Sequence, residues 1–87
     1  MMMYLVLTIQ SATHAEEISL LNAWVNVSTH KEAFAILSDE LSLLGWVVTN
    51  VIESMPTEES DYFAPCESLD AFNEASKGVL ALRFKSS

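Results

Sequence analysis

Basic residues, cysteine, glycine and proline are all scarce in this sequence of 87 residues. Four Lys and Arg stand against twelve Asp and Glu, which gives a formal net charge of −8. Nucleic acids and anionic membrane surfaces are bound through Lys and Arg contacts to phosphate. The composition therefore argues against a nucleic acid or a membrane as the partner.

The single cysteine, Cys66, has no second cysteine with which to form an internal disulfide. Nothing in the chain therefore requires an oxidising compartment. Acidic neighbours, Glu67 and Asp70, disfavour a reactive thiolate at Cys66, which we interpret as an incidental cysteine. No C-x-x-C, H-x-x-x-H or D-x-D-x-D-G spacing occurs, and we predict neither a metal nor a cofactor.

The only two glycines, Gly45 and Gly78, both follow predicted helices. No glycine is left for a phosphate-binding loop, and no nucleophile-elbow sequence is present. His30, in the first turn of a predicted helix, is more typical of a solvent-facing residue than of a general base. An enzyme is therefore not indicated.

The length allows a single domain, residues 1–87, and the apolar fraction of 51% is high for so small a chain. Either nearly all apolar side chains enter one core, or some of them meet a partner. No apolar run is long enough to span a membrane. The start, "MMMYLVLTIQSATHA", has no Lys or Arg before its apolar run, so we predict a strand rather than a signal peptide, and a cytoplasmic protein.

Alternation of apolar and polar residues predicts strands over 5–10 and 80–85. Residues 46–54 are apolar on both faces, as in a central strand. Residues 13–22 are ambiguous: they form either one or two helical turns or part of a long strand that ends near Ser28. We favour the strand, paired with the first through a turn near His14.

The clearest helix is predicted over 30–44. Thr29 and Glu32 have the spacing of a capping box, and Gly45 follows where a left-handed residue closes a helix. A second, shorter helix is predicted from a cap at Ser68 to Gly78.

Between these helices, Pro56 and Pro65 bracket an acidic connection without periodicity, which we interpret as solvated. The predicted order is β-β-α-β-α-β, an α+β class. Because each helix has one apolar stripe, both most simply cover the same face of an antiparallel or mixed sheet of about four strands. That arrangement is a two-layer, ferredoxin-like sandwich.

Residues 23–84 resemble a group of small, functionally uncharacterised bacterial proteins. These proteins carry a W-V-x-A strand, an Ala/Leu-rich helix ending in G-W-x-V, and an acidic strand exit followed by Asp-Tyr. The matching residues are Trp24, Val25, His30 to Leu44, Gly45, Trp46, Val48, Glu53, Asp61 and Tyr62. The resemblance implies a small ferredoxin-like fold and no catalytic residue.

An open sheet face is predicted opposite the helices, and it carries aromatic and β-branched residues, which is unlike ordinary solvated surface. The candidates on this face are Tyr4, Val6, Trp24, Asn26, Trp46 and Val48. We expect a non-enzymatic interaction module that homodimerises through this face or meets another protein there. The alternative is a small-molecule binding or sensing domain, with Asp61, Tyr62 and Phe63 as ligand candidates in a cleft near the 54–67 loop.

Overall fold

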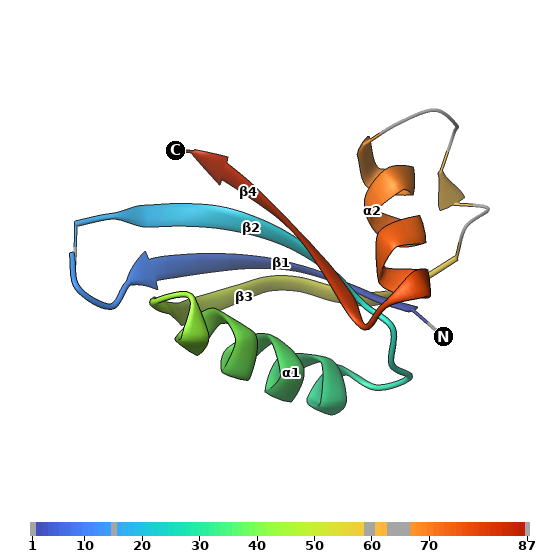
Figure 1. Ribbon diagram of the computed structural model, residues 1–87, viewed down its shortest axis with the longest axis horizontal. Coiled ribbons are helices and arrows are strands. Elements are labelled where there is room, and N and C mark those ends of the chain that lie inside the picture. Colours follow the sequence, from blue (N-terminus) through green and yellow to red (C-terminus); the bar gives the residue numbers. More distant parts are fainter. Residues whose placement is uncertain (1, 15, 59–60, 63–66, 87) are drawn as a thin grey trace.

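A computed structural model of the chain describes residues 2–14, 16–58, 61–62 and 67–86. It contains four strands and two helices (Figure 1). In chain order they are β1 (Met2–Ser11), β2 (Ile18–Val25), α1 (His30–Leu43), β3 (Trp46–Thr57), α2 (Glu67–Lys77) and β4 (Leu80–Ser86). Neither helix is long and apolar enough to cross a lipid bilayer in the described part of the chain.

The strands form one antiparallel sheet in the order β3-β1-β2-β4. The predicted α+β class with a four-stranded sheet and two helices is thus confirmed. Residues 18–25 form a strand rather than a helix, as favoured, and β2 pairs with β1 from Met3↔Val25 to Gln10↔Ile18. The turn between them is held by a backbone hydrogen bond of 2.9 Å from Glu17 to His14.

One face of the sheet, the first face, is covered by α1. Leu5, Leu7 and Ile9 alternate along β1 and point to this side, where they are fully buried. They pack with Leu21, Ala23 and Val25 of β2 and with Ala33, Leu37 and Leu41 of α1. The spacing of three helical residues four apart gives α1 the single apolar stripe that this contact requires.

Both predicted ends of α1 are confirmed. Thr29 is the N-cap, and its hydroxyl oxygen accepts a hydrogen bond of 3.2 Å from the Glu32 backbone N–H. The Thr29 hydroxyl in turn donates to the Glu32 carboxylate at 3.1 Å. Gly45 has a φ of 86°, a left-handed conformation that a glycine adopts without strain.

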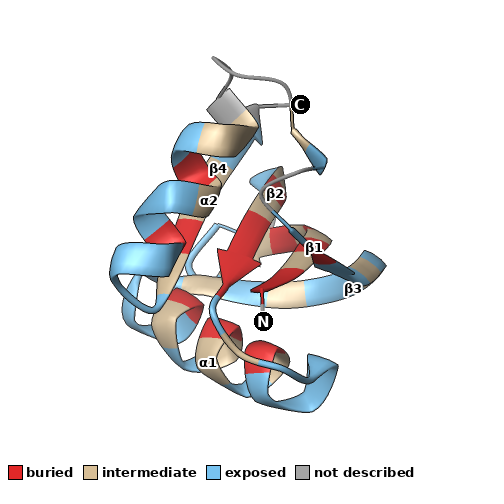
Figure 2. Ribbon diagram, turned by 90° about the vertical axis from the view of Figure 1, so that its right-hand side faces the viewer, coloured by how far each residue is buried: buried red, intermediate tan, exposed pale blue. Residues whose placement is uncertain are grey.

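The opposite side of the sheet, the second face, is partly covered by α2. Met2, Trp24 and Ala81 point to this side and are buried with Ala71 and Ala75 of α2. Two small alanines on the helix let it approach the large Trp24 closely. The buried residues of α2 and α1 thus cover opposite sides of the sheet, as Figure 2 shows in red.

The predicted ferredoxin-like layering and strand order are therefore not confirmed. Both helices were expected on one face, whereas α1 packs on the first face and α2 on the second. An amphipathic pattern shows which stripe of a helix is buried, but it does not say which sheet face buries that stripe. The order β3-β1-β2-β4 also makes β3 an edge strand, not the central strand expected from its two apolar faces.

Two boundaries also differ from the predictions. β3 runs through Pro56 to Thr57, so Pro56 lies inside the strand and does not open the irregular connection. An edge position tolerates a proline because the missing N–H is not needed by a second neighbour. Ser68 lies inside α2, one residue after its first residue, and is not its cap. Pro65 and Cys66 lie outside the described residues.

Candidate functional site

The long edge strand β3 is the first part of the candidate site. It pairs with β1 on one side, and no strand lies on its other side in the described chain. Glu53 is the only charged residue among its twelve residues. Three of its large apolar side chains are 43–53% exposed: Val47, Ile52 and Met55. An exposed, uncharged edge of this kind is a template for pairing with another chain.

The hydrogen-bond register between β3 and β1 shifts twice, between Val6 and Leu7 and between Thr8 and Ile9. Each shift inserts one extra residue into β3, Ile52 and Thr49, which is the signature of a β-bulge. Bulges and a terminal proline moderate the pairing of natural edge strands, but the commonest protection, a row of lysines, is missing from β3.

A hollow of about 250 Å³ lies between β3 and α1. Its lining consists of Phe34, Ser38 and Ser42 from α1 and of Trp46, Val47 and Val48 from β3. The three α1 residues recur every four positions, so they form one stripe of the helix. No residue of β1 is among the lining residues, and the Trp46 ring lies 6.1 Å from the Phe84 ring of β4. None of the lining residues carries a charge.

One polar contact ties α1 to β3 near the other end of this stripe. His30 Nδ1 and Ser54 Oγ share a hydrogen bond of 2.6 Å, and the His30 ring lies 6.0 Å from the Phe34 ring. A nucleophilic triad would need a carboxylate on the second imidazole nitrogen. Among residues with described side chains, no carboxylate is hydrogen-bonded to His30. The pair therefore fixes the first turn of α1 against β3.

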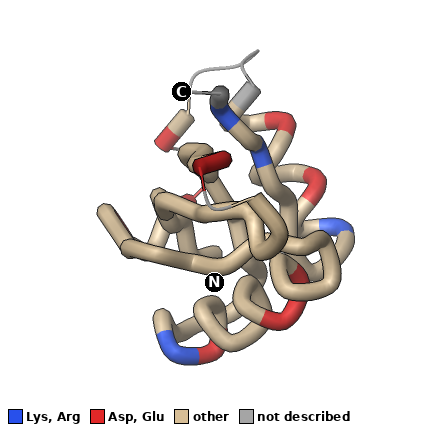
Figure 3. The backbone as a smooth tube through the Cα atoms, turned by 90° about the vertical axis from the view of Figure 1, so that its left-hand side faces the viewer, with Lys and Arg blue, Asp and Glu red and all other residues tan. Residues whose placement is uncertain are grey.

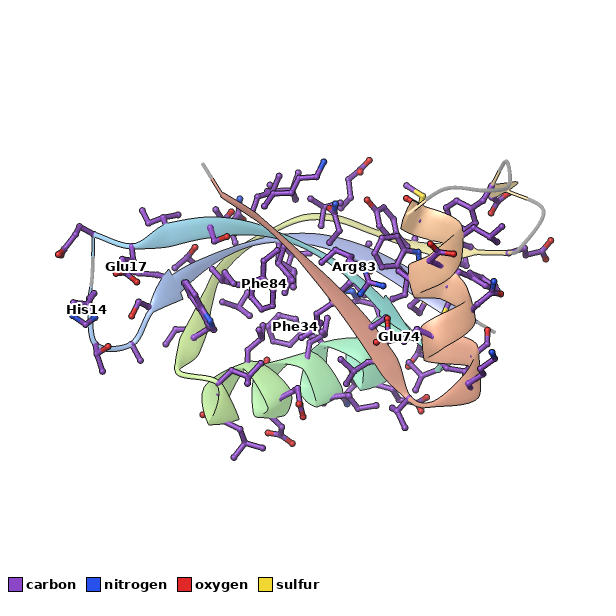
Figure 4. The ribbon with its side chains drawn as sticks, turned by 45° about the horizontal axis from the view of Figure 1, so that its top comes forward. His14, Glu17, Phe34, Glu74, Arg83 and Phe84 are labelled. Carbon is purple, nitrogen blue, oxygen red and sulfur yellow. The ribbon has the colours of Figure 1, made fainter. Side chains whose placement is uncertain are left out.

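Charged residues lie mainly on the helices, on β4 and in the connections, while most of the sheet is uncharged (Figure 3). Arg83 of β4 donates a hydrogen bond of 2.8 Å to Glu74 of α2 and joins these two elements (Figure 4). The two side chains are 28% and 56% exposed, so solvent screens the ion pair. Glu53 is the single charge among the residues of β3 and those that line the hollow.

Half of the second face is left open by α2. Val6, Thr8 and Gln10 of β1 point to this open half with Leu20 and Ile18 of β2, and all are at least partly exposed. Val47 pairs with Gln10 and Met55 with Tyr4, so both β3 side chains lie on this same face. The open half is therefore continuous with the exposed edge of β3.

The residues predicted to share one open face are placed differently by the structure. Tyr4 and Trp24 do lie on the second face, with ring centroids 4.9 Å apart, but Trp24 is only 2% exposed beneath α2. Val6 lies on the open half. Trp46 and Val48 pack against the core of the first face, because Val48 pairs with Ile9. Asn26 is exposed just beyond β2.

Asp61 and Tyr62, predicted as ligand candidates, make internal contacts. Trp24 Nε1 donates a hydrogen bond of 2.8 Å to Tyr62 Oη, and the Tyr62 ring lies 5.8 Å from Phe72 of α2. The Asp61 carboxylate accepts a hydrogen bond of 2.8 Å from the Glu58 backbone N–H. Phe63 lies outside the described residues.

Thr57 completes a chain of hydrogen bonds at this point. Its hydroxyl oxygen lies 3.0 Å from both Asp61 Oδ2 and Tyr62 Oη. The Thr57 hydroxyl is the donor toward both oxygens, and its single hydrogen serves one of them at a time. The chain Trp24–Tyr62–Thr57–Asp61 thus gives the indole N–H an acceptor and links Thr57 to both neighbours. Its geometry is that of a latch that joins Thr57, Asp61 and Tyr62 to Trp24 of β2.

Tyr4, on the second face beside Trp24, has a raised pKa. Burial raises the pKa of its phenol above the ordinary value of 10.0, and the nearby Tyr62 and Glu53 raise it further. The Tyr4 hydroxyl stays protonated and donates a long hydrogen bond of 3.4 Å to Asn22. In the described residues, no three His, Cys, Asp or Glu side chains gather as a metal site would require.

The edge of β3 was not among the predicted sites, because its two apolar faces suggested a central strand. A signal was nevertheless available in the sequence. This strand has one charge in twelve residues, and its apolar side chains, several of them exposed, must be covered by something. A comparison with protein-family models, curated proteins and solved structures finds no match. Membership in the group of small bacterial proteins stays a prediction.

Proposed function

We propose that this protein is a non-enzymatic interaction module that works as a homodimer. The observation that carries the proposal is the edge of β3, where a strand with a single charge exposes Val47, Ile52 and Met55 beside an uncharged hollow. Contiguous exposed apolar surface on a small domain is typical of a contact surface. The open half of the second face extends this surface. It includes part of the face that was predicted to bind a second copy.

A second copy of the chain can meet this surface with little charge repulsion at the contact itself. Two molecules that each carry −8 repel one another, and repulsion is weakest where the contact itself holds few charges. The β3 edge meets that condition, with Glu53 as its only charge. A basic partner would instead be attracted to the acidic residues of the helices and connections.

The proposal is tested by placing a charge within the surface. Val47 is 53% exposed, so Val47→Glu should leave the free chain folded, but a dimer would have to bury the added carboxylate. Leu43→Glu is the matched control, because Leu43 is 83% exposed on α1 and does not line the hollow. Sedimentation velocity should show the control as a dimer and Val47→Glu as a monomer. Equal masses for the two variants would contradict the proposal.

A small-molecule binding or sensing function is a second candidate, and the hollow is the observation that favours it. Its 250 Å³ would admit a small apolar ligand, and Ser38 and Ser42 could orient a polar group. This hollow lies between α1 and β3, away from the 54–67 loop where the sequence suggested a cleft. Trp46 lines it, so binding should change Trp fluorescence and raise the melting temperature across a panel of small apolar molecules. A flat response would remove the support for this function.

We further propose that the protein acts in the cytoplasm, since its single cysteine requires no oxidising compartment. Cell fractionation with an antibody against the chain would test this location. Recovery in a membrane or extracellular fraction would contradict it.

A further inference from the structure

We infer that the two copies join edge to edge, with β3 of one copy pairing antiparallel to β3 of the other about a two-fold axis through Val51. The inference rests on the proposed homodimer and specifies its geometry. The pairing would turn two four-stranded sheets into one continuous sheet. Half of the backbone N–H and C=O groups of β3 point away from β1, and pairing would satisfy those along the seam.

With the two-fold axis at Val51, residues that lie opposite one another across the seam belong to the same face of the sheet. In an antiparallel pair, residues directly opposite point to the same side of the sheet. Here Val47 of one copy would face Met55 of the other, and both lie on the second face. Val48 would likewise face Ser54, and both lie on the first face, where they pair with Ile9 and Leu5. A register centred one residue later, on Ile52, would set Val51 opposite Glu53, although these two lie on different faces.

The same register keeps the single charge of β3 in one copy away from the same charge in the other copy. Glu53 of one copy would face Thr49 of the other, so the two carboxylates do not meet. A register centred on Glu53 would set the two carboxylates directly opposite, which destabilises a strand pair. The axis through Val51 also lies near the middle of β3, so nearly the whole strand pairs. Pro56, which lacks an N–H, would fall at the ends of the seam.

The helices are compatible with this arrangement. A two-fold axis perpendicular to the sheet keeps both copies of α1 on the same side of the joined sheet. The α1 stripe beside β3 consists of Phe34, Ser38 and Ser42, which carry no charge. Two serines on this stripe leave room for the second helix to approach across the seam. The hollow of each copy would then border the contact.

The test uses single cysteines in a Cys66→Ser background under mild oxidation. In the inferred register, the two Val51 Cα atoms lie roughly 5 Å apart, within disulfide reach. The two Val47 Cα atoms would lie about 27 Å apart, eight residues along the strand. We expect Val51→Cys to yield crosslinked dimer as its main species and Val47→Cys to stay at the level of the Cys66→Ser parent.

The outcomes separate this inference from the proposed function. A dimeric mass with no more crosslinking at Val51 than at Val47 would overturn the edge pairing and leave the homodimer standing. A monomeric mass at all concentrations would overturn both. If Val51→Cys fails to fold, hydrogen exchange on the unmodified chain replaces it. Amides of β3 should then exchange more slowly at high than at low protein concentration, and equal rates in a dimeric sample would overturn the pairing.

Discussion

Replacing Tyr62 with Phe is expected to destabilise the fold by removing a single oxygen atom. The substitution keeps the ring, so the contact with Phe72 at 5.8 Å is retained. It removes the acceptor of the Trp24 indole N–H, which lies 2.8 Å from Tyr62 Oη. The perturbation therefore acts on the latch and leaves the packing of α2 in place.

The expected size follows from the burial of Trp24. The residue is 2% exposed, so water cannot replace the lost acceptor. A buried donor left without a partner costs about 1–3 kcal/mol, and we expect a loss of about 2 kcal/mol in the free energy of unfolding. Thr57 keeps its bond to Asp61 at 3.0 Å and adds little to this loss. In a domain of this size, such a change lowers Tm by about 8–16 °C.

Tyr4→Phe is the matched control, because it also removes one phenol oxygen from the second face. The Tyr4 hydrogen bond to Asn22 is long, 3.4 Å, and both residues are partly exposed. Its loss should cost about 0.5 kcal/mol or less. Urea unfolding at equal protein concentrations gives both values. If Tyr62→Phe costs no more than Tyr4→Phe, the hydrogen bond between Trp24 and Tyr62 does not stabilise the fold.

Three further outcomes follow from the described contacts. Leu37→Ala, at a fully buried position of α1, should lower the free energy of unfolding by about 2–5 kcal/mol in urea titrations. Thr29→Ala should cost about 1 kcal/mol by the same measurement, because it removes the N-cap acceptor. Since the pKa of Tyr4 is raised, its contribution to stability should be fully present below pH 10.0 and lost as the pH rises through the folded-state pKa. In an ultraviolet titration, Glu53→Gln should lower that pKa, and an unchanged midpoint would exclude Glu53 as a cause.

Local patterns in the sequence predicted the ends of α1 and several of the strands, because these features depend on neighbouring residues. Thr29, Glu32 and Gly45 marked the ends of α1, because capping and a left-handed glycine depend only on neighbouring residues. The alternation in β1 and β4 and the absence of a Gly or Pro break before Trp24 indicated strands. These predictions needed no knowledge of which elements meet in space.

The faces of the sheet could not be assigned in the same way. α2 buries Ala71 and Ala75 whether it packs on one side of a sheet or on the other. A signal was available in β1, where the second face begins with Met2 and Tyr4 and continues with Thr8 and Gln10. A face that is apolar at one end and polar at the other indicates a cover over half its length, which is where α2 lies.

The candidate site was predicted only in part for the same reason. Trp24 was selected because a tryptophan on an open face should meet a partner, but the partner of its indole is Tyr62 of the same chain. The Asp61–Tyr62 pair was recognised as distinctive, and its contacts give it a structural role in the latch. Val6 is the predicted interface residue that lies on the open half of the second face.

The molar mass of the unmodified chain in solution decides whether the protein is a homodimer. Light scattering on a sizing column, across a dilution series, should give twice the chain mass of 9.6 kDa at high concentration and fall toward 9.6 kDa on dilution. That result would support the homodimer. A mass of 9.6 kDa at every concentration would contradict the homodimer.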